Sequence, residues 1–251
     1  MSDDYILETR GLCKAFRGFH AVKDVSLRVK RHAVHALIGP NGAGKTTCFN
    51  LLTKFLPVSA GTISFNGRDI TRAEPADVAL MGLARSFQIS AVFGQMTVLE
   101  NVRVALQRRE APTFAFWRSE RVLDGLNDEA MVLIERLGLA RWRDTPAADL
   151  SYGRKRALEL ATTIALEPAL ILLDEPMAGL GSEDIAPVMR LIADVAHQRT
   201  VLMVEHNMKV VAELCDRITV LQAGEILAEG SYDEVSRDAR VIEAYVGGVH
   251  A

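Results

Sequence analysis

One short loop constrains the fold of this chain more than any other stretch of it. The run His35-Ala36-Leu37-Ile38 leads directly into Gly39-Pro40-Asn41-Gly42-Ala43-Gly44-Lys45-Thr46, and a helical pattern from Thr46 to Leu52 follows. The loop fits the pattern G-x-x-x-x-G-K-[ST], for which ordinary residue frequencies predict about 0.01 matches in a chain of this length. A strand, this loop and a helix in that order predict phosphate binding at the edge of an α/β sheet.

The composition of the loop indicates what it binds. Glycine lets backbone N–H groups converge on phosphate oxygens, and the helix behind the loop presents its positive end to the same anion. Lys45 is expected to reach the β- and γ-phosphates and Thr46 to bind Mg²⁺. We therefore predict ATP and Mg²⁺ as ligands. The predicted nucleotide-binding residues here are Gly39, Pro40, Asn41, Gly42, Ala43, Gly44, Lys45, Thr46 and Thr47.

A second strand end supplies carboxylates. The continuous apolar runs 170–173 and 201–204 are typical of parallel strands buried on both faces, and residues 186–196 between them form a helical pattern. Asp174 and Glu175 follow the first run, at the edge where parallel sheets bind ligands. Asp174 suits a Mg²⁺ shell, and Glu175 suits the orientation of an attacking water. Alone, the pair could equally be an acidic loop, but the phosphate loop upstream favours a site.

The remaining patterns divide the chain. Residues from about 5 to 38 are predicted to form strands, with short alternating runs such as 25–29 that indicate a half-exposed antiparallel sheet, and residues 61–66 to form a further strand. Residues 89–162 are mostly helical, with a capping box at Thr97–Glu100 and a helix over 127–137. A hairpin around Ala223-Gly224 and a helix over 240–245 end the chain. The fold class predicted is α/β, a P-loop NTPase (RecA-like) core with an N-terminal antiparallel β subdomain and an inserted α-helical subdomain. The predicted domains are 1–88 and 163–251 for the core and 89–162 for the helical subdomain.

Composition excludes several classes of function. The net charge is −3 and charges of both signs are interspersed, so no polyanion-binding tail is present. No apolar run approaches the roughly 20 residues of a membrane helix, and the acidic start Met1-Ser2-Asp3-Asp4 does not fit a signal peptide. The cysteines Cys13, Cys48 and Cys215 are far apart, which predicts reduced thiols.

The turn Leu150-Ser151-Tyr152-Gly153-Arg154 narrows the choice, because it opens a helical pattern that runs into the strand ending at Asp174. Together with the phosphate loop, this order resembles the ATP-binding cassette (ABC) family over nearly the whole chain. The resemblance implies that Ser151 and Gly153 complete the ATP site of a second subunit. It thus implies an ATPase that acts as a dimer.

The resemblance assigns three further residues. It implies that His206 is the switch histidine at the γ-phosphate, that Gln88 touches Mg²⁺ and water, and that Phe16 stacks on adenine. Taken without the family, they would be a structural histidine, a polar loop residue and a core aromatic. The basic residues 154–156 either attract an anion or form a solvated face in which Lys155 pairs with Glu159.

Several segments resemble one branch of the family, the ATPase subunits of branched-chain amino acid importers. They are residues 82–88, 96–102, 151–153 and 241–247. The resemblance implies a second ATPase subunit in a homo- or heterodimer, transmembrane permease subunits, and indirectly a periplasmic binding protein, at the cytoplasmic face of the bacterial inner membrane. One departure is Gly181, where the family usually has an aspartate that helps the two sites communicate.

Three alternatives remain open at the level of the sequence. An exporter ATPase, similar to those of lipopolysaccharide export, is the nearest. A soluble ABC protein acting on ribosomes or DNA would usually carry two cassettes or a coiled coil, and the aromatic-basic segment 108–121 is no basic stripe, so nucleic acid is not an expected partner. A small-molecule kinase would have neither the Ser151 turn nor His206.

Overall fold

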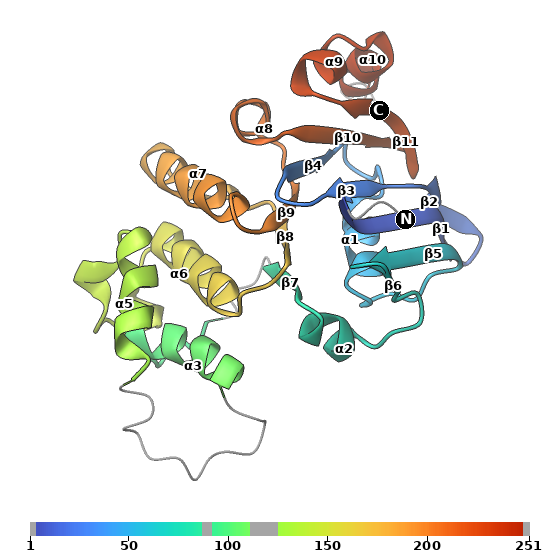
Figure 1. Ribbon diagram of the computed structural model, residues 1–251. Coiled ribbons are helices and arrows are strands. Elements are labelled where there is room, and N and C mark those ends of the chain that lie inside the picture. The colour runs from blue at the N-terminus through green and yellow to red at the C-terminus, as the bar shows by residue number, and fades with distance from the viewer. Residues whose placement is uncertain (1–3, 87–91, 111–124, 248–251) are drawn as a thin grey trace. The chain divides into compact units, whose positions relative to one another are not determined.

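The computed structural model describes residues 4–86, 92–110 and 125–247, which form two compact units. The first consists of residues 1–85, 169–175 and 196–251, and the second of residues 86–168 and 176–195. The division into domains at 1–88, 89–162 and 163–251 stays a prediction. Figure 1 labels the elements.

An antiparallel sheet is built from the N-terminal part of the first unit. Its order is β2-β1-β5-β6, with β3 also paired to β1. Buried and exposed residues alternate along much of β1, as a sheet with one covered face requires, and Leu7 lies opposite Phe65. The predicted antiparallel sheet is confirmed for these strands, whereas residues 34–38 of the same stretch join the second sheet in parallel pairing. The bounds are β1 Tyr5–Phe16, β2 Phe19–Val25, β3 Arg28–Lys30, β5 Ala60–Phe65 and β6 Arg68–Asp69.

A second sheet of six strands has the order β11-β10-β4-β9-β8-β7. β10, β4, β9 and β8 are parallel, and all residues of β4, β8 and β9 are buried, as the apolar runs predicted. The predicted hairpin is β10 and β11, whereas β7 was not predicted. The bounds are β4 Val34–Ile38, β7 Leu83–Ser86, β8 Leu170–Asp174, β9 Thr200–Val204, β10 Arg217–Gln222 and β11 Glu225–Gly230.

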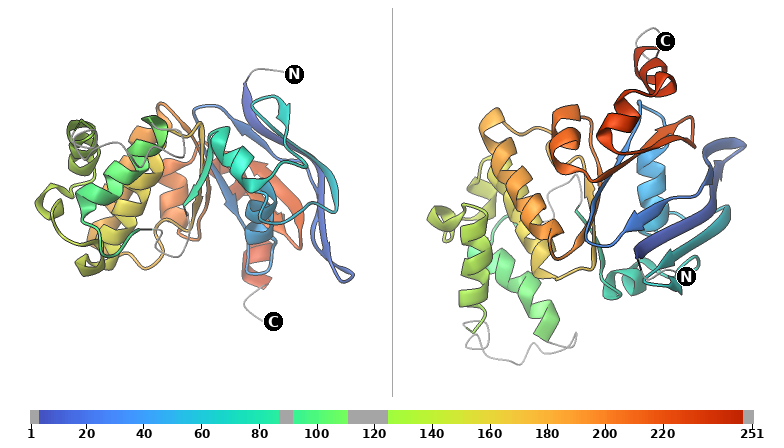
Figure 2. Two further views of the ribbon diagram at one scale, coloured as in Figure 1. Left: turned by 90° about the horizontal axis from the view of Figure 1, so that it is seen from below. Right: turned by 45° about the horizontal axis from the view of Figure 1, so that its top comes forward.

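Helix α1 (Lys45–Leu52) anchors the phosphate loop in the core of the first unit. Phe49, Leu51 and Leu52 are fully buried and share one hydrophobic cluster with residues of both sheets. Burying such side chains stabilises by about 1.5–3 kcal/mol each, so the helix behind the loop is held firmly. The unit also contains α2 (Pro75–Leu80) and α8 (Met208–Leu214), and α9 (Tyr232–Ser236) and α10 (Ala239–Gly247) lie beside the β10–β11 hairpin (Figure 2).

The second unit is helical. Its helices are α3 (Val98–Glu110), α5 (Asn127–Arg136), α6 (Tyr152–Ala165) and α7 (Ser182–Ala196, whose last residue belongs to the first unit), with 3₁₀ turns at Ala140–Trp142 and Ala147–Asp149. The predicted capping box is present, since Thr97 N–H donates to Glu100 Oε2 at 2.7 Å and Glu100 N–H donates to Thr97 Oγ1 at 3.2 Å.

Two details of the helical unit complete the description. α7 begins at Ser182, four residues before the start predicted at residue 186, because Glu183 and Asp184 favour the positive N-terminal end of the helix. None of the helices in the described ranges has the length and apolarity that crossing a bilayer requires.

Candidate nucleotide site

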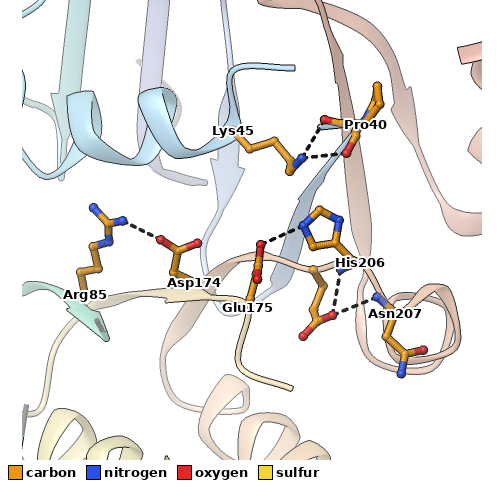
Figure 3. A network of polar contacts seen from close by, with 9 residues as sticks. Pro40, Lys45, Arg85, Asp174, Glu175, His206 and Asn207 are labelled. Carbon is orange, nitrogen blue, oxygen red and sulfur yellow. Dashed lines mark hydrogen bonds and ion pairs between the residues drawn. The ribbon is translucent and has the colours of Figure 1, made fainter. Parts of the chain in front are cut away.

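The strand order places the predicted phosphate loop and the carboxylates at one sheet edge. β4, β9 and β8 are parallel neighbours, so their carboxyl ends meet side by side. The loop 39–46 follows β4, Asp174 ends β8, and His206 follows β9 by two residues. Figure 3 shows these side chains converging from three strand ends. This is the edge where parallel α/β sheets bind ligands.

The loop has a backbone that only glycine can adopt at two points. Gly39 (φ +148°) and Gly44 (φ +101°) have left-handed conformations, and a Cβ on either would lie 2.1 Å from the carbonyl oxygen of Leu221 or 2.5 Å from that of Ala21. Gly44 is also the N-cap of α1 and offers no side-chain cap. The first N–H groups of α1 are therefore not capped by a side chain, as an anion site at a helix end requires.

Lys45 is held inside the loop. Its side chain is buried, and Nζ donates to the carbonyl oxygens of Gly39 at 2.7 Å and Pro40 at 2.9 Å. Burial lowers the pKa of the ammonium, while the charges of Glu175 and Asp174 oppose that change. The two carboxylates are thus close enough to act on Lys45, and the structure brings the three predicted residues together. The other loop residues, Asn41, Gly42, Ala43, Thr46 and Thr47, surround it in sequence, with Thr46 exposed.

Glu175 and His206 form a pair. His206 Nε2 lies 2.8 Å from Glu175 Oε1, and both side chains are partly exposed. Glu175 has φ +48°, an unusual value for a residue other than glycine, and its N–H donates to the carbonyl of Val204. This backbone turns the chain sharply after β8, so that the consecutive carboxylates of Asp174 and Glu175 have different partners (Figure 3).

Glu205 is a residue that the sequence did not single out. Its carboxylate is buried and accepts the backbone N–H groups of His206 at 2.9 Å and Asn207 at 3.0 Å. Asn207 in turn caps α8 through the N–H of Lys209. The buried carboxylate fixes the loop that carries His206, and its only signal in the sequence was an acid directly after an apolar strand.

Asp174 is bound to an arginine that the sequence analysis did not predict. Arg85 Nη2 donates to Asp174 Oδ2 at 2.6 Å, and Arg85 Nη1 donates to Asn50 Oδ1 at 2.6 Å. Hydroxyl and carboxylate oxygens such as those of Thr46 and Asp174 are ligands that Mg²⁺ prefers, and with a nucleotide one or two protein ligands suffice. The residues present therefore fit a Mg²⁺ ion held together with nucleotide phosphates. Within the described ranges, no cluster of three or more His, Cys, Asp or Glu side chains offers an all-protein metal site.

Two aromatic side chains belong to the same compact unit as the phosphate loop. Phe16, predicted to stack on adenine, is 43% exposed, and the ammonium of Lys14 lies 5.1 Å from the centre of its ring. An exposed face is what stacking needs, but its role stays a prediction. Tyr245 of α10 was not predicted: its phenol oxygen faces the backbone N–H of Gly39, and burial raises its pKa.

The Ser151 turn belongs to the helical unit. Ser151 is exposed at the N-cap of α6, and its side chain makes no capping hydrogen bond. Gly153 is buried, and a Cβ there would lie 2.2 Å from the carboxylate of Asp184. A Cβ on Gly179 would lie 2.8 Å from the ring of Tyr152. The turn is thus packed against the segment that follows Glu175 in the chain.

The basic residues of this helix differ from the expected pairing. Glu159 pairs with Arg156 at 2.8 Å, and both are buried, so the expected pair of Glu159 with Lys155 was wrong. Lys155 donates to the carbonyl of Ala148, and the guanidinium of Arg154 lies 3.8 Å from the ring centre of Trp142. Because Glu159 faces the core, its partner is the buried Arg156 three residues away and not Lys155 four residues away.

Two predictions lie outside the described residues. Gln88 falls in the segment 87–91, and most of the aromatic-basic segment 108–121 falls in 111–124. Their roles stay predictions.

Comparison with known proteins places the chain among transport ATPases. The family model described as ABC transporter matches residues 22–178, and one described as branched-chain amino acid ATP-binding cassette transporter matches residues 225–251. The chain is 37% identical to the high-affinity branched-chain amino acid transport ATP-binding protein LivG of Salmonella typhimurium, and 38% to BraF of Pseudomonas aeruginosa. Each alignment covers 96% of this chain and 98% of the relative.

A solved structure has the same architecture. The ADP conformation of MJ1267, an ATP-binding cassette of an ABC transporter, superposes with a TM-score of 0.84 at 30% identity, covering 97% of this chain and 99% of the other. A nucleotide-free ATP-binding cassette from an ABC transporter gives 0.83 at 30% identity, covering 96% and 98%.

Proposed function

The chain belongs to the ABC transporter family, and from that premise we propose how its site works. It is the ATP-binding and ATP-hydrolysing subunit of an ABC importer for branched-chain amino acids. The single observation that carries the mechanism is the Glu175–His206 pair, at the same sheet edge as Lys45 and Asp174. A carboxylate held by an imidazole, next to a phosphate loop, is placed to orient water toward a terminal phosphate.

Each residue has a separate part in hydrolysis. The loop N–H groups and Lys45 bind the phosphates and offset charge that develops on them. Glu175 orients and polarises the attacking water, and His206 fixes the position of Glu175 Oε1. Thr46 and Asp174 would hold Mg²⁺, which supplies charge neutralisation at the phosphates when bound. Phe16 would stack on adenine, and Gln88 would contact Mg²⁺ and water.

The partners follow from the family. ABC ATP-binding subunits dimerise and work with transmembrane permeases. We propose that Ser151 and Gly153 contact ATP bound by the Lys45 of a second ATPase subunit, identical or different. The assembly would sit at the cytoplasmic face of the bacterial inner membrane, with a periplasmic binding protein on the other side of the permease.

The test of the mechanism is Glu175→Gln. Because the amide cannot polarise water as the carboxylate does, turnover should fall about 100-fold or more. Binding of ATP should persist, and ATP should trap a dimer visible by light scattering. Glu135→Gln, on the exposed face of α5, is the matched control and should leave turnover unchanged. Steady-state hydrolysis by Glu175→Gln at the wild-type rate would refute the role of Glu175.

A further inference from the structure

Arg85 carries a charge that the proposed mechanism does not use. It lies near the end of β7 and joins two elements of the site, since one nitrogen bonds Asp174 of β8 and another bonds Asn50 of α1, each at 2.6 Å. Its guanidinium carbon lies 5.7 Å from the centre of the Phe49 ring. The side chains of Arg85 and Asp174 are only 10% and 5% exposed.

Burial alone does not set this pair apart, because Arg156–Glu159 of α6 is buried to the same degree, at 8% and 6% exposure. Removing two charges from water costs free energy, and an apolar pair of similar size is often as stable. The pair Arg217–Glu229 of the β10–β11 hairpin has the same shortest N–O distance, 2.6 Å, but is 49% and 22% exposed. The carboxylate that Arg85 binds is also the one that suits Mg²⁺. The arginine is therefore placed where its charge acts on the metal position.

The sign of that action follows from elementary electrostatics. A guanidinium keeps its charge at every pH at which the protein is folded. Arg85 and Mg²⁺ would both interact with Asp174, and each reduces the attraction of the carboxylate for the other cation.

Resting on the proposed function, we propose that Arg85 is a positioning residue that shares the Asp174 carboxylate with Mg²⁺ and so weakens the dependence of nucleotide binding on the metal. It holds the carboxylate against α1 and compensates its charge when nucleotide binds without metal. Without the charge of Arg85, the Asp174 carboxylate repels the nucleotide more strongly until Mg²⁺ arrives. Mg²⁺ then strengthens nucleotide binding by a larger factor than it does in the wild type.

The measurement is the affinity for a fluorescent ADP analogue in EDTA and in saturating Mg²⁺. The ratio of the two dissociation constants is the metal coupling. It is compared in the wild type, Arg85→Gln, Asp174→Asn and the double variant Arg85→Gln/Asp174→Asn. Arg217→Gln is the matched control, because it removes the cation of a similar ion pair outside the site.

Arg85→Gln should raise the coupling at least tenfold, mainly by weakening binding in EDTA. Asp174→Asn should nearly abolish the coupling, and the double variant should resemble Asp174→Asn, because Arg85 acts through that carboxylate. Arg217→Gln should match the wild type. A coupling in Arg85→Gln within threefold of the wild type overturns the proposal.

Folding of the variants is informative too. If Arg85→Gln alone does not fold but the double variant does, the negative charge of Asp174 is the cause, and the proposal gains support. If neither folds, Arg85 is a structural tie and the proposal is wrong. A wild type that binds no nucleotide at all would instead refute the proposed function.

Discussion

Glu175 stands in a backbone conformation that an L-residue adopts at a cost. A left-handed residue other than glycine costs roughly 1–2 kcal/mol, and here the cost is offset by the N–H bond to Val204 and the contact with His206. Such outliers persist where the surrounding structure fixes them, most often at functional sites. Positive φ alone does not mark a catalytic residue, because seven other residues besides glycine have it in the described ranges. At Glu175 it gives this carboxylate a different partner from that of Asp174, as the proposed role requires.

His35 lies on the strand that leads into the phosphate loop. It is buried and belongs to a chain of hydrogen bonds with Thr219 and Glu229. Thr219 Oγ1 donates to Glu229 Oε2 at 3.0 Å, so its single proton is used and His35 Nε2, at 2.8 Å, must donate to it. His35 Nδ1 has no hydrogen-bond partner among the described residues. Burial lowers the pKa of His35 to about 4, against the smaller raising effect of Glu229, and Arg217 also lowers it.

We therefore predict a loss of stability in mild acid that depends on His35. Its pKa is 6.5 when unfolded and about 4 when folded, so the unfolded chain binds the extra proton first and stability falls as the pH drops from 6.5 to 4. The difference between the two pKa values corresponds to a loss of about 3 kcal/mol in the free energy of unfolding. Urea unfolding at pH 7.5 and pH 4.5 measures it.

The comparison needs two variants. His35→Gln should lose less stability than the wild type over that range, whereas His20→Gln, at an exposed position, should lose as much. Equal losses in the wild type and His35→Gln would contradict the assignment.

At the scale of the element, α6 depends on one buried ion pair. Arg156 and Glu159 lie 2.8 Å apart on its core face, beside Ala157, Leu158 and Ala161. A buried charge that loses its partner is costly, while a pair replaced by apolar side chains is not. The helix that presents Ser151 thus depends on both charges together.

Arg156→Ala should destabilise the protein by about 3–5 kcal/mol because Glu159 is left buried without its partner. Arg156→Met/Glu159→Met should recover most of the loss. Lys155→Met, one residue away, should cost below about 1 kcal/mol, since its bond to Ala148 is exposed. Thermal and urea unfolding of the variants decide the matter, and a double variant no more stable than Arg156→Ala would contradict it.

Elements with one strong local pattern could be predicted from the sequence. The phosphate loop and the parallel strands β8 and β9 follow from spacing and from continuous apolar runs. β7 could not, because Leu83–Ser86 is too short for a clear pattern. The bond of Arg85 to Asp174 joins residues 89 positions apart, and only the strand order brings them together. Arg156, not Lys155, bonds Glu159 because helix packing, invisible in the sequence, decides which side chain faces the core.

At the scale of the whole molecule, the residues predicted to act on one ATP belong to different compact units. Lys45, Asp174, Glu175 and His206 are in the first, and Ser151 and Gly153 are in the second. If the family arrangement holds, each site combines the first unit of one chain with the second unit of another. Gly181 lacks the carboxylate that usually helps the sites communicate, so we expect each site to work without the other.

Mixing two inactive variants tests both expectations. Lys45→Ala removes the phosphate-binding ammonium, and Ser151→Arg places a bulky cation in the turn, so each variant alone should be inactive. In a mixed dimer, one site combines an intact Lys45 with an intact Ser151. Random pairing makes half of the dimers mixed, and each has one working site of two, so about a quarter of wild-type turnover should return.

The control is a mixture of Lys45→Ala with Lys45→Ala/Ser151→Arg, in which no intact site forms and no activity should return. Turnover near a quarter means that Ser151 acts across the dimer and that the sites are independent, as Gly181 predicts. No recovery, in a mixture shown by cross-linking to contain mixed dimers, would contradict one of the two expectations: either Ser151 acts on the site of its own chain, or both sites must be intact together. If both sites must be intact together, the missing carboxylate at Gly181 has not uncoupled the two ATP sites.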